Sequence, residues 1–116
     1  MINYHDQVIT ALNTIGLPMH YEMVLHSGLK TPCISYMQLG DTIISQTDIT
    51  DISRISYQIK IWSTKMQDLQ EYAAKIDAVM RDLNFRRVSC AELYDNNSAM
   101  MQKVLTYEAI SLETFK

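Results

Sequence analysis

The most regular pattern of hydrophobic and polar positions runs from Arg54 to Leu83 and predicts a strand followed by a helix. Every second position of its first part is apolar: Ile55, Tyr57, Ile59 and Ile61. Successive side chains of a strand point to opposite faces, so one face of this strand is apolar. From Leu69 to Leu83 apolar residues recur at helical spacing, so this helix can cover that face. Thr64 and Gln67 have the spacing of a capping box, which predicts that the helix begins near Lys65.

Weaker patterns predict the elements before this unit. Asn3 is a suitable N-cap for a first helix that ends before Gly16, and the alternation between Met19 and Leu25 indicates a strand. After a turn at Ser27-Gly28, a second strand is expected at Cys33–Leu39.

The residues after the central helix predict a hairpin. Asn84 occupies the expected C-cap position of that helix. A strand follows from Phe85 to Tyr94, in which Val88 and Cys90 are expected to point inward. The turn-forming residues 95–98 (D-N-N-S) then lead to a returning strand at 101–112.

These elements together predict an α+β fold with the order α-β-β-β-α-β-β. Its sheet has about five mainly antiparallel strands, and two helices pack on one face of it. A length of 116 residues fits one domain.

Residues 40–53 fit this scheme least well, because they are polar yet contain several isoleucines. They are expected to form a long hairpin tip or a mobile arm that becomes ordered against another subunit, and a disordered loop is an equal alternative.

Composition narrows the classes of function. A net charge of −3 and the absence of a basic cluster argue against binding to nucleic acid through its phosphates. No apolar run reaches the roughly 20 residues that span a bilayer, so no membrane association is expected. The two cysteines, Cys33 and Cys90, are too far apart for a paired zinc site and are interpreted as buried free thiols.

No residue pattern predicts catalysis, a cofactor or a metal site. The three histidines, His5, His20 and His26, lack the short spacing that commonly anchors a zinc ion. The three aspartates of residues 40–53 (Asp41, Asp48 and Asp51) lack calcium-loop spacing, so turn and cap roles explain them better.

Trp62 is the most informative single residue, because it points away from the apolar face of its strand. Large aromatic residues outside a core are enriched in protein interfaces. The alternative is a tryptophan at the rim of the sheet that lies over Lys60.

Three segments resemble the tail completion, tail-to-head joining and tail terminator proteins of long-tailed bacteriophages and prophages. These segments are residues 57–63 (Y-Q-I-K-I-W-S), residues 72–76 (Y-A-A-K-I) and the closing 84–85 (N-F). The resemblance covers most of the chain in layout. Many relatives carry Pro-Tyr on the second strand, whereas residues 32–36 here read P-C-I-S-Y.

The resemblance implies a structural protein of the virion that is assembled in the host cytoplasm. Such proteins form rings, commonly hexamers, at the head-proximal end of the tail, where they end the tail tube or join it to the head. The implied partners are other copies of the chain, tail tube proteins and head-tail connector proteins, with no sequence-specific contact to DNA. The residues expected at subunit contacts are Trp62, Lys60, Asp41, Ile43, Ile44, Asp48 and Ile49. The competing class is a cytoplasmic α+β domain that binds a small ligand, or a minor enzyme.

Overall fold

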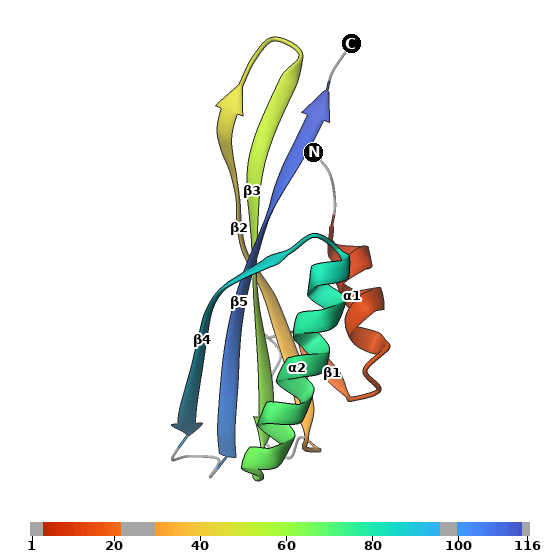
Figure 1. The fold of residues 1–116 in the computed structure, drawn as a ribbon, viewed down its shortest axis with the longest axis vertical. Coiled ribbons are helices and arrows are strands. Elements are labelled where there is room, and N and C mark those ends of the chain that lie inside the picture. The colour runs from red at the N-terminus through yellow and green to blue at the C-terminus, as the bar shows by residue number, and fades with distance from the viewer. Residues whose placement is uncertain (1–3, 22–29, 96–99, 115–116) are drawn as a thin grey trace.

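The computed structural model describes residues 4–21, 30–95 and 100–114, and within them two helices and five strands form one layered unit (Figure 1). In chain order these are α1 (His5–Asn13), β1 (Met19–Tyr21), β2 (Cys33–Gln46), β3 (Thr50–Ser63), α2 (Met66–Asp82), β4 (Arg86–Asp95) and β5 (Met100–Thr114).

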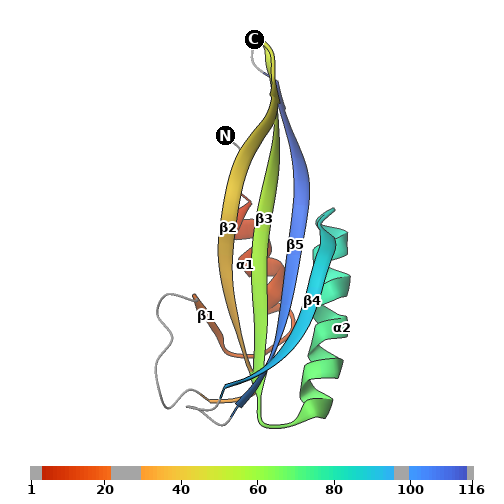
Figure 2. The same cartoon turned by 90° about the vertical axis from the view of Figure 1, so that its left-hand side faces the viewer.

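The five strands form one sheet in the order β1-β2-β3-β5-β4. Only β1 and β2 run parallel, and the other neighbours are antiparallel. Both helices lie on the same side of this sheet, as the views from two sides show (Figures 1 and 2). The predicted α+β class, element order and placement of the helices are therefore confirmed.

The core lies between the helices and the middle of the sheet. Tyr57 of β3 stands opposite Tyr107 of β5, and Ile59 stands opposite Leu105; all four are at most 1% exposed. From α2, the fully buried side chains Leu69, Ile76 and Met80 belong to the same cluster. Burial of each such aliphatic side chain contributes roughly 1.5–3 kcal/mol. The predicted packing of residues 69–83 on residues 55–61 is confirmed.

The predicted capping box of α2 is wrong, and Ser63 takes its place. The Ser63 hydroxyl accepts a hydrogen bond from the Lys65 N–H (3.1 Å) and donates one to Asp68 Oδ2 (2.8 Å). Lys65 is the N-cap and has no side-chain cap. Ser63 is on the helix-facing side of β3 and 2% exposed, so its hydroxyl lies beneath the first turn, whereas Thr64 is exposed.

The C-terminus of α2 ends one residue earlier than predicted. Leu83 is the C-cap, and Asn84 follows it with a φ of 66° in the left-handed region, where asparagine is tolerated. The Asn84 N–H donates to Arg81 O and the Phe85 N–H donates to Met80 O, which is the Schellman pattern. Phe85 is thereby turned into the core, where it is 2% exposed.

Two other sequence predictions need correction, and a third is confirmed. Val88 is 47% exposed, because it occupies a register shift between Arg87 and Ser89. Cys90 stands opposite Leu105 but is exposed, because β4 is the edge strand. Cys33 is buried as predicted.

Some predicted features lie outside the described residues. These are the Asn3 N-cap, the strand beyond Tyr21, the turn at Ser27-Gly28, and residues 96–98 of the second turn. In the described part, α1 begins at His5 with Tyr4 as its N-cap.

Candidate interaction site

An arm of three strands projects beyond the helices and is the most distinctive feature of the molecule (Figure 1). We define it as residues 39–56 and 109–114. Pairing with β1 ends at Tyr36 of β2, and pairing with β4 ends at Glu108 of β5, so only β2, β3 and β5 continue. The molecule is consequently elongated, with principal extents of 51 × 24 × 22 Å.

The structure decides between the alternatives for residues 40–53. They form a β-hairpin, since β2 runs to Gln46 and β3 begins at Thr50. At the tip, the Thr47 N–H donates to Thr50 O (2.7 Å) and the Thr50 N–H donates to Thr47 Oγ1 (3.0 Å). The hairpin alternative is confirmed and the disordered loop is wrong.

Two irregularities in β2 explain why this strand was hard to recognise. The register with β3 shifts between Gln38 and Gly40 and again between Ile43 and Ser45. Each shift inserts one residue, and the inserted residues are Leu39 and Ile44. Both of these apolar side chains are exposed, to 46% and 45%.

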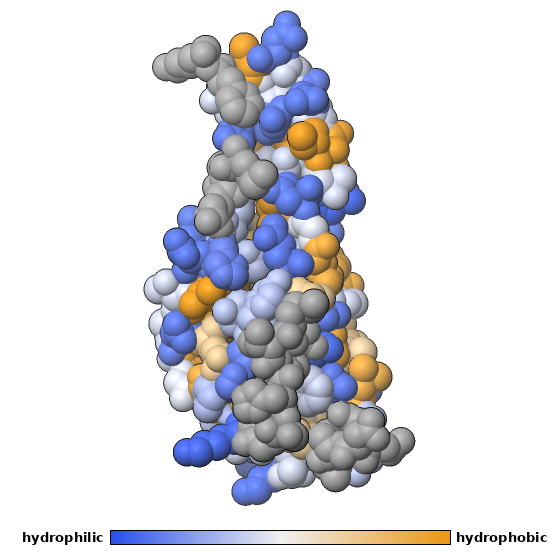
Figure 3. Space-filling view, turned by 180° about the vertical axis from the view of Figure 1, so that it is seen from behind, coloured by the Kyte–Doolittle hydropathy of each residue, from blue (hydrophilic) through white to orange (hydrophobic). Residues whose placement is uncertain are grey.

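Exposed apolar side chains gather on the arm. Of the eleven exposed large hydrophobic residues in the described part of the chain, six lie there: Leu39, Ile43, Ile44, Ile49, Ile110 and Leu112. In the view from behind, hydrophobic surface recurs along the right-hand margin, on the side away from the helices (Figure 3). Clustered exposed apolar surface is typical of interaction sites.

The residues predicted at subunit contacts fall in two separate places. Asp41, Ile43, Ile44, Asp48 and Ile49 are all exposed on the arm. Lys60 and Trp62 lie near the other end of β3, on the sheet face without helices. Ile43 stands opposite Ser53, seven residues before Lys60 on the same strand, which corresponds to roughly 24 Å.

Trp62 is held in a defined position on that sheet face. Its Nε1–H donates to Ser35 Oγ (2.9 Å), and Lys60 Nζ lies 5.8 Å from the centroid of its ring. The ring is half-buried, and Cys33 stands opposite it on β2. A fixed aromatic surface beside a positive charge is suited to binding another protein.

Glu108 joins three strands on the same sheet face. It accepts from Arg86 of β4 (3.1 Å) and lies 3.7 Å from Arg54 of β3. The arginines are well exposed, so these pairs contribute little to stability. They fix charged side chains at the base of the arm.

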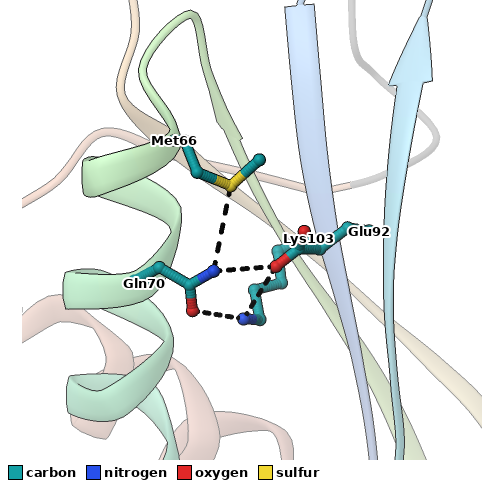
Figure 4. A network of polar contacts seen from close by, with 4 residues as sticks. All are labelled: Met66, Gln70, Glu92 and Lys103. Atoms are coloured by element: carbon teal, nitrogen blue, oxygen red, sulfur yellow. Dashed lines mark hydrogen bonds and ion pairs between the residues drawn. The ribbon is translucent and has the colours of Figure 1, made fainter.

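A polar network between α2 and the sheet was not predicted (Figure 4). Lys103 Nζ donates to Gln70 Oε1 (2.8 Å) and to Glu92 Oε1 (3.2 Å), and Gln70 Nε2 donates to the same Glu92 oxygen (2.9 Å). Lys103 is only 9% exposed. The sequence does contain a sign of this network, because Lys103 occupies one of the alternate, mostly apolar positions of residues 101–111 that face the core.

A second unpredicted contact buries a tyrosine hydroxyl. Tyr107 donates to Asp77 Oδ1 (3.1 Å), and the second oxygen of Asp77 pairs with Arg81 Nε (3.1 Å). Burial and the neighbouring Asp77 charge raise the pKa of Tyr107 well above its usual range. Asp77–Arg81 and Glu71–Lys75 (3.6 Å) are both pairs of residues four apart on the surface of α2.

The described residues assemble little that is typical of a catalytic site. Among them, no group of three or more His, Cys, Asp or Glu side chains converges to hold a metal ion. His5 lies beside Tyr36, and His26 is outside the described residues. Burial raises the pKa of the Cys33 thiol, which disfavours the reactive thiolate.

One shallow depression lies on the outer side of α1. Its lining residues are Asp6, Gln7, Thr10, Ala11, Thr14 and Leu83. Asp6 is its one titratable group, so it contains no acid–base pair. Neither helix in the described part of the chain has both the length and the apolar character needed to cross a membrane.

No protein-family model matches the chain, and no curated protein is significantly similar to it.

Proposed function

We propose that this chain is a structural assembly protein of a bacteriophage tail and catalyses no reaction. It forms a ring with other copies of itself at the head-proximal end of the tail. There it ends the tail tube or joins it to the head through contacts with tail tube and connector proteins. Its place of action is the virion, and assembly occurs in the host cytoplasm.

The observation that carries this proposal is the concentration of exposed isoleucine and leucine on the arm. Four of these side chains (Ile43, Ile49, Ile110 and Leu112) are each more than half exposed. In an isolated monomer they contribute little to folding, whereas contact with another subunit would remove their surface from water.

The separation of two surfaces also supports a ring. A head-to-tail contact requires two different patches on each subunit, and closure of that contact gives a ring. The arm and the Trp62 face are two such patches on one chain, at different ends of β3. The resemblance in residues 57–63 to tail proteins favours this interpretation over other ring-forming proteins.

Association in solution tests the proposal. Size-exclusion chromatography with light scattering should give a mass several times the 13.4 kDa of one chain at high concentration, and negative-stain microscopy should show particles with a central opening. A folded chain that stays monomeric at every concentration would contradict the proposal.

A matched pair of variants separates the arm from general surface hydrophobicity. Ile43→Thr with Ile49→Thr keeps β-branched residues and strand propensity but removes apolar surface. Val88→Thr makes the same kind of change at a 47% exposed position of the edge strand β4. We expect the arm variant to weaken association at least about tenfold, since each Ile→Thr change removes two apolar carbons that contribute about 0.8 kcal/mol each when buried. Equal effects of the two changes would refute an arm contact.

Trp62→Ala tests the second patch. We expect it to weaken association more than folding, because the ring is half-buried and makes one side-chain hydrogen bond, to Ser35. Thermal unfolding and light scattering on the same samples measure both effects. Equal losses of stability and association would assign Trp62 to the fold alone.

A further inference from the structure

Within residues 4–21, 30–95 and 100–114, one edge of the arm has no strand partner. β5 pairs with β3 along its length up to Thr50 opposite Thr114, whereas β4 pairs no further along β5 than Arg86 opposite Glu108. Residues 109–114 therefore have one side on which no strand in the described part of the chain pairs. We call this side the open edge of β5. Unpaired backbone N–H and C=O groups on such an edge can accept an added strand.

The other edges in the described part of the chain are short or interrupted: the outer edge of β1 spans three residues, and β2 and β4 contain register shifts. β2 has register shifts after Gln38 and after Ile43, and β4 has one after Arg87. Bulges of this kind hinder pairing with further strands. Residues 109–114 (A-I-S-L-E-T) keep an unbroken register with β3 and contain neither proline nor lysine, which are the residues that usually protect an edge.

The side chains of the open edge of β5 alternate in a way that suits pairing with themselves. Ile110 and Leu112 are 57% and 60% exposed and point to the sheet face without helices, since they stand opposite Arg54 and Ile52 of β3. Ala109 and Ser111 point to the other face and are buried.

We propose that the open edge of β5 binds the same edge of a second copy of this chain. The two strands pair antiparallel about a two-fold axis at Ser111. Residues opposite each other in an antiparallel pair point to the same face, so Ile110 faces Leu112 of the partner subunit, and the converse contact forms at the other end. Glu113 faces Ala109 of the partner subunit, which keeps the two carboxylates apart.

This register is favoured over its neighbours by the apolar contacts. A two-fold axis on Leu112 would place each Ile110 opposite Thr114 and leave one Leu–Leu contact. The axis on Ser111 gives two Ile–Leu contacts with the same number of paired residues. Five residues a side are few compared with roughly 20–30 in a stable interface, so we expect a weak pair that depends on concentration.

Cysteine cross-linking tests both the pair and its register. The background carries Cys90→Ser, because Cys90 is exposed, and keeps Cys33, which is buried. Ile110→Cys and Leu112→Cys are made separately, mixed and oxidised. Opposite residues lie about 4.5–5.5 Å apart across a strand pair, within disulfide reach. Two copies of Ile110 lie roughly 8 Å apart, beyond that reach.

We expect a linked species of twice 13.4 kDa from the mixture and at most a trace from either variant alone. No linked species from the mixture at any concentration would overturn the pair. Equal linking by each variant alone would overturn the register. Circular dichroism on each variant confirms that it is folded before oxidation.

The pair does not rest on the proposed ring, and one comparison separates the two. Ile110→Lys with Leu112→Lys should abolish cross-linking of cysteine placed at Ser111. Ile43→Thr with Ile49→Thr should weaken the ring and leave the cross-link unchanged, because these residues lie on the hairpin and not on β5. Loss of the cross-link in this hairpin variant would refute two independent surfaces.

Discussion

Lys103 offers a direct test of what a buried lysine contributes to this fold. Its side chain is 11% exposed, and its amino group binds Gln70 and Glu92 (Figure 4). Two contributions can be separated: the packing of its methylene stem and the polar contacts of its charge. Lys103→Met keeps most of the stem and removes the charge, whereas Lys103→Ala removes both.

The structure allows an estimate for each change. Truncation to alanine removes three buried methylene groups beyond Cβ, at about 0.8 kcal/mol each, or roughly 2.4 kcal/mol. Loss of the polar contacts is partly offset, because the lysine no longer has to be desolvated and the 40% exposed Glu92 can bind water. We expect Lys103→Met to cost about 1 kcal/mol or less, and Lys103→Ala about 2–3 kcal/mol.

Urea unfolding followed by circular dichroism measures both values, with m compared among the variants to verify that the same surface is exposed on unfolding. Gln70→Ala is a useful third variant, because it removes one acceptor while leaving the lysine stem in place. If Lys103→Met were as destabilising as Lys103→Ala, packing of the stem would not be the larger contribution and the reasoning would be wrong.

Three further predictions concern helix ends and a buried tyrosine. Ser63→Ala should destabilise the fold by about 1 kcal/mol and Thr64→Ala by much less, because only the Ser63 hydroxyl accepts a hydrogen bond from the Lys65 N–H. Urea unfolding measures both changes, and a larger effect of Thr64→Ala would support the capping box at Thr64. Asn84→Ala should lower the melting temperature, since alanine at φ 66° costs about 1–2 kcal/mol, whereas Asn84→Gly should not. Equal melting temperatures of the two variants would show that the left-handed backbone conformation of residue 84 does not determine the effect. The pKa of Tyr107 is raised in the folded state, so the unfolded chain loses this proton first. The contribution of Tyr107 to stability should therefore be constant below about pH 10 and fall above it. Stability above pH 10 should fall less steeply in Tyr107→Phe, and an unchanged slope would exclude Tyr107 as a source.

The strand and helix at the centre of the fold could be predicted because their patterns have no interruptions. From Ile55 to Ile61 every second residue is apolar and is at most 2% exposed in the structure. The helix keeps its spacing from Leu69 to Met80, and each buried position on it was expected. Two adjoining elements with complementary apolar faces leave few ways to pack, which is why this unit fixed the fold class.

The arm could not be predicted in the same way, because bulges break the alternation by which strands are recognised. The insertions at Leu39 and Ile44 each shift the faces by one residue, so residues 39–46 have no period of two. The same effect explains Val88. Strand alternation predicted that its side chain points inward, but it lies at a bulge and is exposed. Cys90 is exposed because β4 is the edge strand, and the order of strands in a sheet cannot be predicted from local sequence.

The exposed isoleucines of the arm have two physical explanations, and their positions distinguish them. Isoleucine is a good strand former, so these residues could serve the hairpin alone. Threonine and valine serve a hairpin equally well, and no residue between Leu39 and Arg54 is buried in the structure. Strand propensity therefore explains β-branched residues on the arm but not their lack of polarity. It also does not explain why the bulges place apolar Leu39 and Ile44 at an exposed edge. A subunit interface would explain both the apolar character of these residues and the position of the bulges. Bulges redirect side chains, and exposed apolar residues stabilise the protein only when another surface covers them.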